Sequence, residues 1–269
     1  MPKQRLDTLL VERNLCSSRT EARKLILAGE VKVDRRTIDK PATEIDPNAE
    51  IEVKHKLPYV SRGGEKLAKA LETFGIRATG RVCLDGGIST GGFTDCLLQN
   101  GAKRVYGVDV GYGQVAWTLR QDDRVILKER TNFRYLTAED LYGEDTPADL
   151  GVMDLSFISL TKVLQPLRNL LIPPREVILL VKPQFEVGRE KVGKKGVVRD
   201  PKDQAAAIFR VVEEAIGLGW LYGGLTWSPI TGPAGNVEYL LWLNEFSDRS
   251  SPALAEIEAL AVGAIGELG

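Results

Sequence analysis

The 269-residue sequence has very little of the residues from which metal sites and disulfide frameworks are built. It contains one histidine, His55, and three cysteines, Cys16, Cys83 and Cys96. No two cysteines have metal-ligand spacing, and an odd number without a secretory signal argues against a disulfide framework. A single histidine cannot build a His-rich metal site, and a Ser-His-Asp triad would depend on it alone. We therefore expect no metal, and we interpret His55 as a solvated residue of a charged linker.

Long apolar runs are also absent. The longest, such as residues 177–181, are far shorter than the roughly 20 residues that a helix needs to span a bilayer. The N-terminus carries basic residues with no apolar segment after them, so it does not have the pattern of a secretory signal. These absences predict a cytoplasmic protein without membrane contact.

Charge is balanced over the whole chain but not along it. The formal net charge is −1, from 36 Lys and Arg against 37 Asp and Glu. Residues 1–66 hold 14 basic and 11 acidic residues, a net charge of +3, so the remainder carries −4. A whole-chain average can hide a basic patch, and the near-neutral total therefore does not exclude a nucleic-acid partner.

The first 55 residues predict a small α+β unit. Leucines in residues 5–15 recur at near-helical spacing, and a second helix is expected over 19–28. Ser17 or Ser18 would cap this second helix, and Gly29 would end it. Two short strands are then expected at 31–34 and 51–53, with a turn at 35–36 between them. Residues 56–61, broken by a proline, predict a linker.

The rest of the chain, residues 62–269, predicts an α/β domain. After a helix over 62–75, apolar runs alternate with helical stretches, which is typical of βαβ units around a parallel sheet. The expected strands are 81–85, 104–109, 124–127, 149–154, 176–182, 220–228 and 236–244. The expected helices are 92–100, 113–121, 159–171, 201–219 and 252–268.

A glycine-rich loop follows the first strand of this domain. Asp85 ends the strand, residues 86–92 form the loop, and a helix comes next. Glycines let a backbone approach a ligand closely, although this loop is neither G-x-G-x-x-G nor a P-loop. Asp109 ends the second strand 24 residues after Asp85, and a carboxylate there suits a ribose diol. The pattern predicts a nucleoside-type cofactor, and a turn that needs glycine only for helix–strand packing is the alternative.

The loop is also the first of several blocks that carry a family resemblance. Residues 84–94 (LDGGISTGGFT) resemble the S-adenosylmethionine loop of the FtsJ-like ribose methyltransferases, in the form found in the TlyA family. Four further blocks are similar to that family: 109–114 (DVGYGQ), 154–160 (DLSFISL), 181–186 (VKPQFE) and 235–239 (GNVEY). So is 60–67, and the N-terminal segment is similar to the S-four RNA-binding domain.

This resemblance implies a domain plan and a cofactor. A small α+β RNA-binding domain (1–55) would precede a linker (56–61) and a Rossmann-like methyltransferase domain (62–269), whose sheet is mostly parallel with the last strand antiparallel. The implied cofactor is S-adenosylmethionine. The implied cofactor-binding residues are Asp85, Gly86, Gly87, Ser89, Thr90, Gly91, Gly92, Phe93, Asp109, Val110 and Asp154.

The family also carries a Lys-Asp-Lys-Glu tetrad, which falls on Lys66, Asp154, Lys182 and Glu238. Charged residues are seldom buried unless they are paired, so those at the ends of apolar strands need partners. A ribose 2′-hydroxyl attacks a methyl group only when its proton is removed. Lys182 is the predicted base, because burial and a second ammonium nearby favour the neutral amine in general. Asp154 and Glu238 would orient it, and Lys66 would hold the ribose or phosphate. An ordinary buried ion-pair network is the alternative.

The implied partner is ribosomal RNA or a ribosomal subunit, with a cytidine ribose as the target. Phe157 could stack on a base or pack in the core. The predicted RNA-binding residues are Arg5, Arg19, Arg23, Lys24, Arg35, Arg36, Arg62, Lys191, Lys194 and Lys195. They combine a basic N-terminal face with a cationic loop over residues 186–200.

Two other classes of function stay open. The TlyA family often carries a haemolysin label, and a membrane-lysing protein would need an apolar hairpin or a basic amphipathic helix. The helix expected over 252–268 is acidic instead. A non-catalytic RNA-binding protein of ribosome assembly would keep the basic face without needing Lys182 or Asp154. The oligomeric state stays open, a monomer included.

Overall fold

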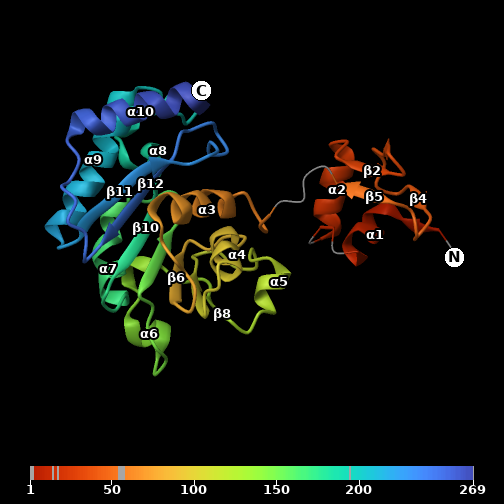
Figure 1. The fold of residues 1–269 in the computed structure, drawn as a ribbon, viewed down its shortest axis with the longest axis horizontal. Helices are drawn as coiled ribbons and strands as arrows, with labels where there is room; N and C mark the ends of the chain where they lie inside the picture. Colours follow the sequence, from red (N-terminus) through yellow and green to blue (C-terminus); the bar gives the residue numbers. More distant parts are fainter. Residues whose placement is uncertain (1–2, 14, 17, 54–57, 194, 269) are drawn as a thin grey trace.

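The computed structural model describes residues 3–13, 15–16, 18–53, 58–193 and 195–268, which form a smaller and a larger body (Figure 1). The sequence expectations for Ser17, His55 and Lys194 lie outside the described residues. The smaller body has one hydrophobic core and the larger body has two.

The smaller body is a helix pair packed on short antiparallel strands. Strand β2 pairs with both β3 and β5, and β1 pairs with β4. Ser18 caps the second helix by accepting a hydrogen bond from the Glu21 amide, as predicted. The turn between β2 and β3 has positive φ at Asp34 and Arg35, the geometry of a tight two-residue hairpin. The elements are β1 (Gln4–Arg5), α1 (Leu6–Glu12), α2 (Arg19–Leu27), β2 (Val31–Val33), β3 (Arg36–Thr37), β4 (Glu44–Ile45) and β5 (Ile51–Val53).

The larger body is built on a seven-stranded sheet in the order β11-β12-β10-β9-β6-β7-β8. Strand β12, the last in sequence, runs antiparallel to both of its neighbours, and the other described pairings are parallel. The predicted sheet is thereby confirmed. The strands are β6 (Val82–Gly86), β7 (Arg104–Val108), β8 (Val125–Lys128), β9 (Leu150–Met153), β10 (Glu176–Val181), β11 (Leu221–Trp227) and β12 (Tyr239–Asn244).

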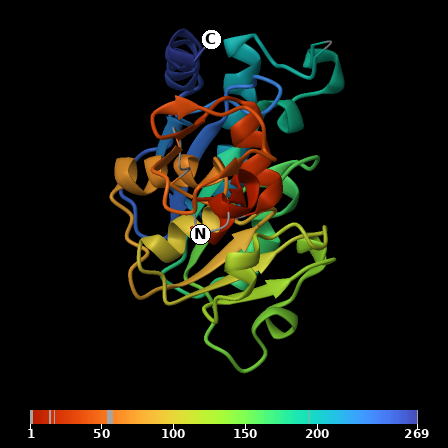
Figure 2. The same cartoon turned by 90° about the vertical axis from the view of Figure 1, so that its right-hand side faces the viewer.

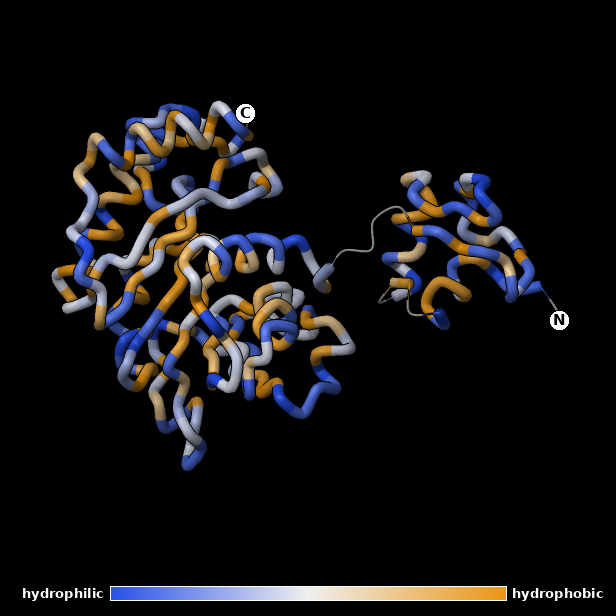
Figure 3. Tube along the Cα trace, in the orientation of Figure 1, coloured by the Kyte–Doolittle hydropathy of each residue, from blue (hydrophilic) through white to orange (hydrophobic). Residues whose placement is uncertain are grey.

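Helices cover both faces of this sheet (Figure 2). Ile178 and Leu180 of β10 pack in one core with α3 and α4, whereas Leu179 and Val181 pack in the other core with α7, α9 and α10. Burial on both sides explains the continuous apolar run of β10, which stands out in Figure 3. The helices are α3 (Gly63–Phe74), α4 (Gly92–Gln99), α5 (Trp117–Arg120), α6 (Ala138–Tyr142), α7 (Leu164–Leu170), α8 (Pro183–Glu186), α9 (Pro201–Gly217) and α10 (Leu254–Leu268), with 3-10 turns η1 (Phe133–Tyr135), η2 (Leu160–Lys162) and η3 (Arg189–Lys191).

The strand order reverses direction beside β6. The chain runs outward from β6 through β7 to β8, and then returns to the other side of β6 to form β9 and β10. Connections that leave β6 and β9 therefore diverge, and a crevice opens at the carboxyl ends of these two strands. Asp154 and the glycine loop lie at this point.

Two predicted helices are shorter than expected. The helix predicted over 113–121 is only α5, because Gly113 has φ +75° and Ala116 has ψ 140°, both outside the right-handed helical region. The helix predicted over 159–171 divides into η2 and α7. Ser159 caps the tighter 3-10 turn of η2, which ends before α7 begins.

The expected linker also differs from the structure over its second half. Tyr59 and Val60 pack against the core that contains α3 and α4, and the Val60 amide donates to Asp95 at 2.7 Å. These residues therefore belong with the larger body.

Candidate active site

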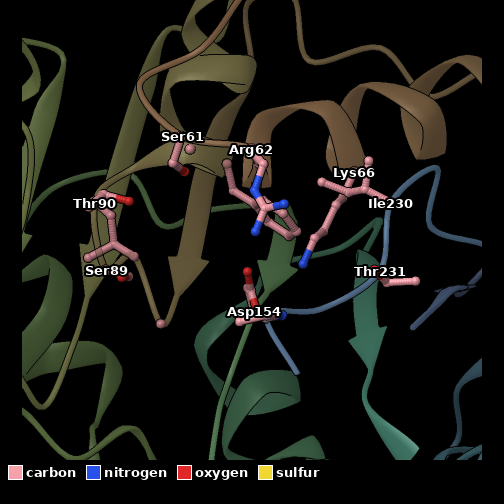
Figure 4. A pocket seen from close by; sticks show the side chains of 14 residues that line it. Ser61, Arg62, Lys66, Ser89, Thr90, Asp154, Ile230 and Thr231 are labelled. Carbon is pink, nitrogen blue, oxygen red and sulfur yellow. The ribbon is translucent and has the colours of Figure 1, made fainter. Parts of the chain in front are cut away.

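Two cavities open at the carboxyl edge of the sheet and share Gly87, Ser89 and Asp154. The larger has a volume of about 420 Å³ and the smaller about 200 Å³. The smaller is lined by polar side chains from four separate stretches, and Figure 4 shows Arg62, Lys66 and Asp154 pointing into it. The two hollows can hold two ligands whose ends meet beside Asp154.

The larger cavity has the character of a nucleoside site. Its walls combine apolar groups, among them Phe133 and Ile158, with the polar side chains of Asp109 and Asn132. The Asp109 carboxylate accepts hydrogen bonds from the Ser89 amide at 2.8 Å and the Gly111 amide at 2.7 Å. A carboxylate has about four lone-pair sites, so Asp109 can shape the loop and still accept from a ligand.

The glycine loop lines the cavities and also packs closely against other parts of the protein. Gly87 has φ +84°, and a Cβ there would lie 2.6 Å from the Asp154 carbonyl oxygen. A Cβ on Gly92 would collide with Ser61. These glycines are therefore needed for packing against the neighbouring strand and against the segment before α3, whatever binds. Of the predicted cofactor residues, Gly87, Ser89, Thr90, Gly92, Phe93, Asp109, Val110 and Asp154 line a cavity.

Asp85 lies behind the loop, fully buried, and does not line either cavity. It accepts a hydrogen bond from the Thr94 hydroxyl at 2.6 Å. Burial raises the pKa of Asp85 to about 7. Asp85 thus connects the end of β6 to the first turns of α4, and its direct contact with a cofactor stays a prediction.

Replacing Asp85 with asparagine is expected to change the pH dependence of stability. The pKa in the folded state lies above that of the unfolded chain, so the contribution of Asp85 is fully present below about pH 4 and is lost as the pH rises to about 7. The free energy of unfolding of the wild type should fall over this range, relative to Asp85→Asn, by on the order of 2–4 kcal/mol. Urea unfolding of the larger body at several pH values measures this, and parallel curves for the two proteins would refute it.

The four residues of the predicted tetrad form two ion pairs. Lys66 Nζ, on α3, lies 2.5 Å from Glu238 Oε2, and Lys182 Nζ, at the end of β10, lies 2.6 Å from Asp154 Oδ1. Lys182 also donates to the Ser156 hydroxyl at 2.9 Å. Exposed fractions are 1% for Glu238, 8% for Lys66 and 9% for Lys182. Because Lys66 and Asp154 both line the smaller cavity, one member of each pair faces the same space.

Some of the predicted RNA-binding residues already form ion pairs with carboxylates of the protein. Arg5 and Arg19 both bind the fully buried Asp7, at 2.8 and 3.2 Å, and the Arg5 guanidinium holds the pKa of this carboxyl far below its usual range. Lys191 pairs with Asp203 at 2.7 Å. The remaining described ones, exposed and without an ion pair in the described part of the chain, are Arg23, Lys24, Arg35, Arg36, Arg62 and Lys195.

Sequence reasoning missed some residues of the site. Thr231, in the β11–β12 loop, lines the smaller cavity, and no local signal could have predicted this because the hairpin brings it there. Ser156 lies inside one of the similar blocks, but its bond to Lys182 required the fold. For Phe157 the structure excludes the core alternative, because 91% of the residue is exposed.

The comparison with known proteins decides the family. Residues 59–245 match the model of the FtsJ-like methyltransferases, and residues 4–51 match the S4 domain. The chain belongs to the FtsJ-like methyltransferase family. The 16S/23S rRNA (cytidine-2'-O)-methyltransferase TlyA of Mycobacterium tuberculosis is similar, at 48% identity over 93% of both chains. Hemolysin A of Brachyspira hyodysenteriae is 40% identical over 88% of this chain and 98% of its own.

Solved structures agree with this assignment. A protein described as a hemolysin from Streptococcus thermophilus has a TM-score of 0.76 and 41% identity, over 99% of this chain and 97% of its own. An S-adenosylmethionine-dependent methyltransferase from Listeria monocytogenes, at 12% identity and a TM-score of 0.50, shares the fold alone. Within the part of the chain that the structure describes, no helix has both the length and the apolar character of a membrane span.

Proposed function

We propose that this FtsJ-like protein transfers a methyl group from S-adenosylmethionine to a ribose 2′-hydroxyl of ribosomal RNA, at a cytidine. The observation that carries the proposal is the meeting of the Lys66–Glu238 and Lys182–Asp154 pairs at a cavity that adjoins the glycine loop. The substrate named for the Mycobacterium tuberculosis relative supports ribosomal RNA and cytidine. A ribosomal substrate would locate the enzyme in the cytoplasm.

The larger cavity fits the proposed cofactor. Asp109 would accept from the ribose diol, and Val110, Asn132 and Phe133 would surround the base. The bound cofactor supplies an electrophilic methyl group. The shared residues Gly87, Ser89 and Asp154 would surround the reacting end, where the two cavities meet. Asp85 would act from behind, by holding Thr94 and the loop.

The two lysines would have different tasks: Lys66 lines the smaller cavity, and Lys182 lies behind Asp154, which lines it too. Lys182 Nζ lies 2.6 Å from Asp154 and donates to the Ser156 hydroxyl. As the neutral amine it would direct its lone pair at the 2′-hydroxyl and take up the proton, while Asp154 sets its direction. Lys66, held by Glu238, would bind the ribose or phosphate. Much of the rate would come from holding hydroxyl and methyl group in line.

RNA recognition would use both parts of the chain. We propose that residues 1–55 bind RNA through their basic side chains, that 56–61 connect the two parts with Tyr59 and Val60 packed against the larger one, and that 62–269 carry catalysis. Arg62, at the mouth of the smaller cavity, and Lys195 would contact phosphates. Lys191 would do so only if it leaves Asp203, and Lys194 belongs to the same proposed loop. The exposed ring of Phe157 would stack on an unpaired base.

The test is a methyl-transfer assay with labelled S-adenosylmethionine and ribosomal RNA that lacks the modification, both naked and in assembled subunits. We expect label on cytidine ribose, located by mass mapping of nuclease fragments. Label on a base would refute the ribose 2′-hydroxyl as acceptor. Tight RNA binding with no transfer to any substrate would favour the assembly-factor alternative, and lysis of lipid vesicles without transfer would favour the haemolysin alternative.

A further inference from the structure

Glu186 is a buried carboxylate outside the tetrad. It ends α8 and is only 2% exposed. Its Oε2 accepts from the Ser159 hydroxyl at 2.6 Å, and its Oε1 accepts from the Leu160 amide at 2.7 Å. Arg210 of α9 supplies a counter-charge 3.5 Å from Oε2 and also donates to the Glu186 carbonyl. A carboxylate this deeply buried needs such partners, because burial disfavours its charge.

The contacts of Glu186 hold one end of the loop over residues 154–160. The other end is held by Lys182, which binds Asp154 and Ser156. Lys182 and Glu186 are four residues apart, at the two ends of α8. One short segment of chain therefore holds both ends of the loop, through an ammonium group on one side and a carboxylate on the other.

Phe157 lies between these two attachments. It has φ +65°, a conformation that costs a non-glycine residue about 1–3 kcal/mol and persists only where the surroundings enforce it. Its ring is exposed and lies 5.1 Å from the ring of Phe185, which belongs to α8 itself. The segment 182–186 thus contacts the loop through Lys182, through Phe185 and through Glu186. The loop also forms a wall of the larger cavity.

We propose that Glu186 is a positioning residue of the methyl transfer, which presents Phe157 to an unpaired base of the RNA by holding Ser159 and Leu160. This inference rests on the proposed function and adds to it a residue that the tetrad does not contain. Its ligand class is a nucleobase beside the target ribose, bound by stacking. Glu186 touches neither the base nor the reacting atoms and acts only through the loop.

The carboxylate is suited to this task in a way that an amide is not. Both oxygens of Glu186 accept from separate donors, and hydrogen bonds to a charged acceptor are about twice as strong as neutral ones. Glutamine has the same shape but no charge, and its oxygen can accept from Leu160 only while its NH₂ group donates to the Ser159 hydroxyl. Glu186→Gln should therefore weaken both attachments of the loop, because the charge-assisted bonds become neutral ones.

The experiment is a double-mutant cycle on ribosomal RNA affinity, measured by direct binding and as KM at saturating cofactor. The proteins are wild type, Glu186→Gln, Phe157→Ala and the double variant. Loss of one base stack should weaken affinity by about 5- to 100-fold in Phe157→Ala, and Glu186→Gln should show a loss within the same range. In the Phe157→Ala background the Glu186 change should add less than about 2-fold, because the residue through which it acts is gone.

Two further variants separate positioning from general stability. Glu176→Gln makes the same chemical change at another buried glutamate of the larger body, which Arg81 and Trp242 hold at the start of β10, and RNA affinity should stay unchanged. Ser159→Ala removes one donor and keeps the charge, so it should reproduce part of the Glu186→Gln effect in a folded protein even where Glu186→Gln folds poorly.

The results that would contradict the role of Glu186 differ from the result that would contradict the proposed methyl transfer. Wild-type affinity in both Glu186→Gln and Ser159→Ala would overturn the positioning role. A double variant whose loss of affinity equals the product of the losses in Glu186→Gln and Phe157→Ala would overturn it as well. A wild-type protein that transfers no methyl group would overturn the proposed function instead. Because RNA binding is measured directly, the cycle still decides on Glu186 in that case.

Discussion

Methyl transfer by the Lys182→Ala variant is expected to be about 100- to 10,000-fold slower than in the wild type, which is the usual range for a lost general base. The physical reason is that Lys182 Nζ, held 2.6 Å from Asp154 and 2.9 Å from Ser156, would present the lone pair of its neutral amine to the 2′-hydroxyl. The loss should appear in the rate constant of the chemical step, measured in single-turnover assays with labelled cofactor. Binding of the cofactor and of the RNA should change little.

The matched control is Lys182→Arg. Arginine keeps a positive charge beside Asp154 but does not give up a proton at accessible pH, so it should be about as slow as alanine if proton uptake is the task. If arginine restored the rate, the charge alone would matter. If Lys182→Ala were as fast as the wild type, Lys182 would not be the base.

The buried pair of Lys66 and Glu238 should separate stability from catalysis. Removing one partner, as in Lys66→Met or Glu238→Met, leaves the other charge buried and should lower the free energy of unfolding by about 3–5 kcal/mol. Replacing both by methionine should restore most of that loss, since an apolar pair of similar volume often replaces a buried ion pair without harm. Methyl transfer should stay low in Lys66→Met and in the double variant, because no cation then faces the smaller cavity from α3, and in Glu238→Met, because Lys66 loses the carboxylate that holds it.

Denaturant unfolding and transfer assays on the same preparations measure both effects. A double variant that regained stability and activity together would mean that the pair is structural. That result would favour the ordinary ion-pair network, which the sequence left open as an alternative to catalysis.

Much of the fold could be predicted from hydrophobic pattern alone. The runs that became β6, β7, β9 and β10 are short, apolar and bounded by turn residues, which indicates strands buried on both faces. Strands alternating with helices then imply a parallel sheet. The pattern failed for short helices such as α6 and α8, because four or five residues are too few to have a measurable period.

The site shows the same division between local pattern and long-range contact. Similar blocks of sequence singled out Lys66, Asp154, Lys182 and Glu238, but not which lysine binds which acid. Lys66 and Glu238 are 172 residues apart, and only the insertion of β12 beside β10 brings Glu238 to α3. Local pattern also assigned the glycine loop to a ligand. Part of the reason for glycine is packing instead, because side chains there would collide with Asp154 and Ser61.

By itself the sequence determined a mostly parallel sheet with the charged tetrad Lys66, Asp154, Lys182 and Glu238 expected at its carboxyl edge, and a basic N-terminal unit before it. Only the tertiary structure decided that Asp85 is buried behind the loop, that Phe157 is exposed, and that Glu186 holds its loop. The physical reason is that burial and pairing depend on atoms brought together from distant parts of the chain, and a local pattern carries no information about those distances.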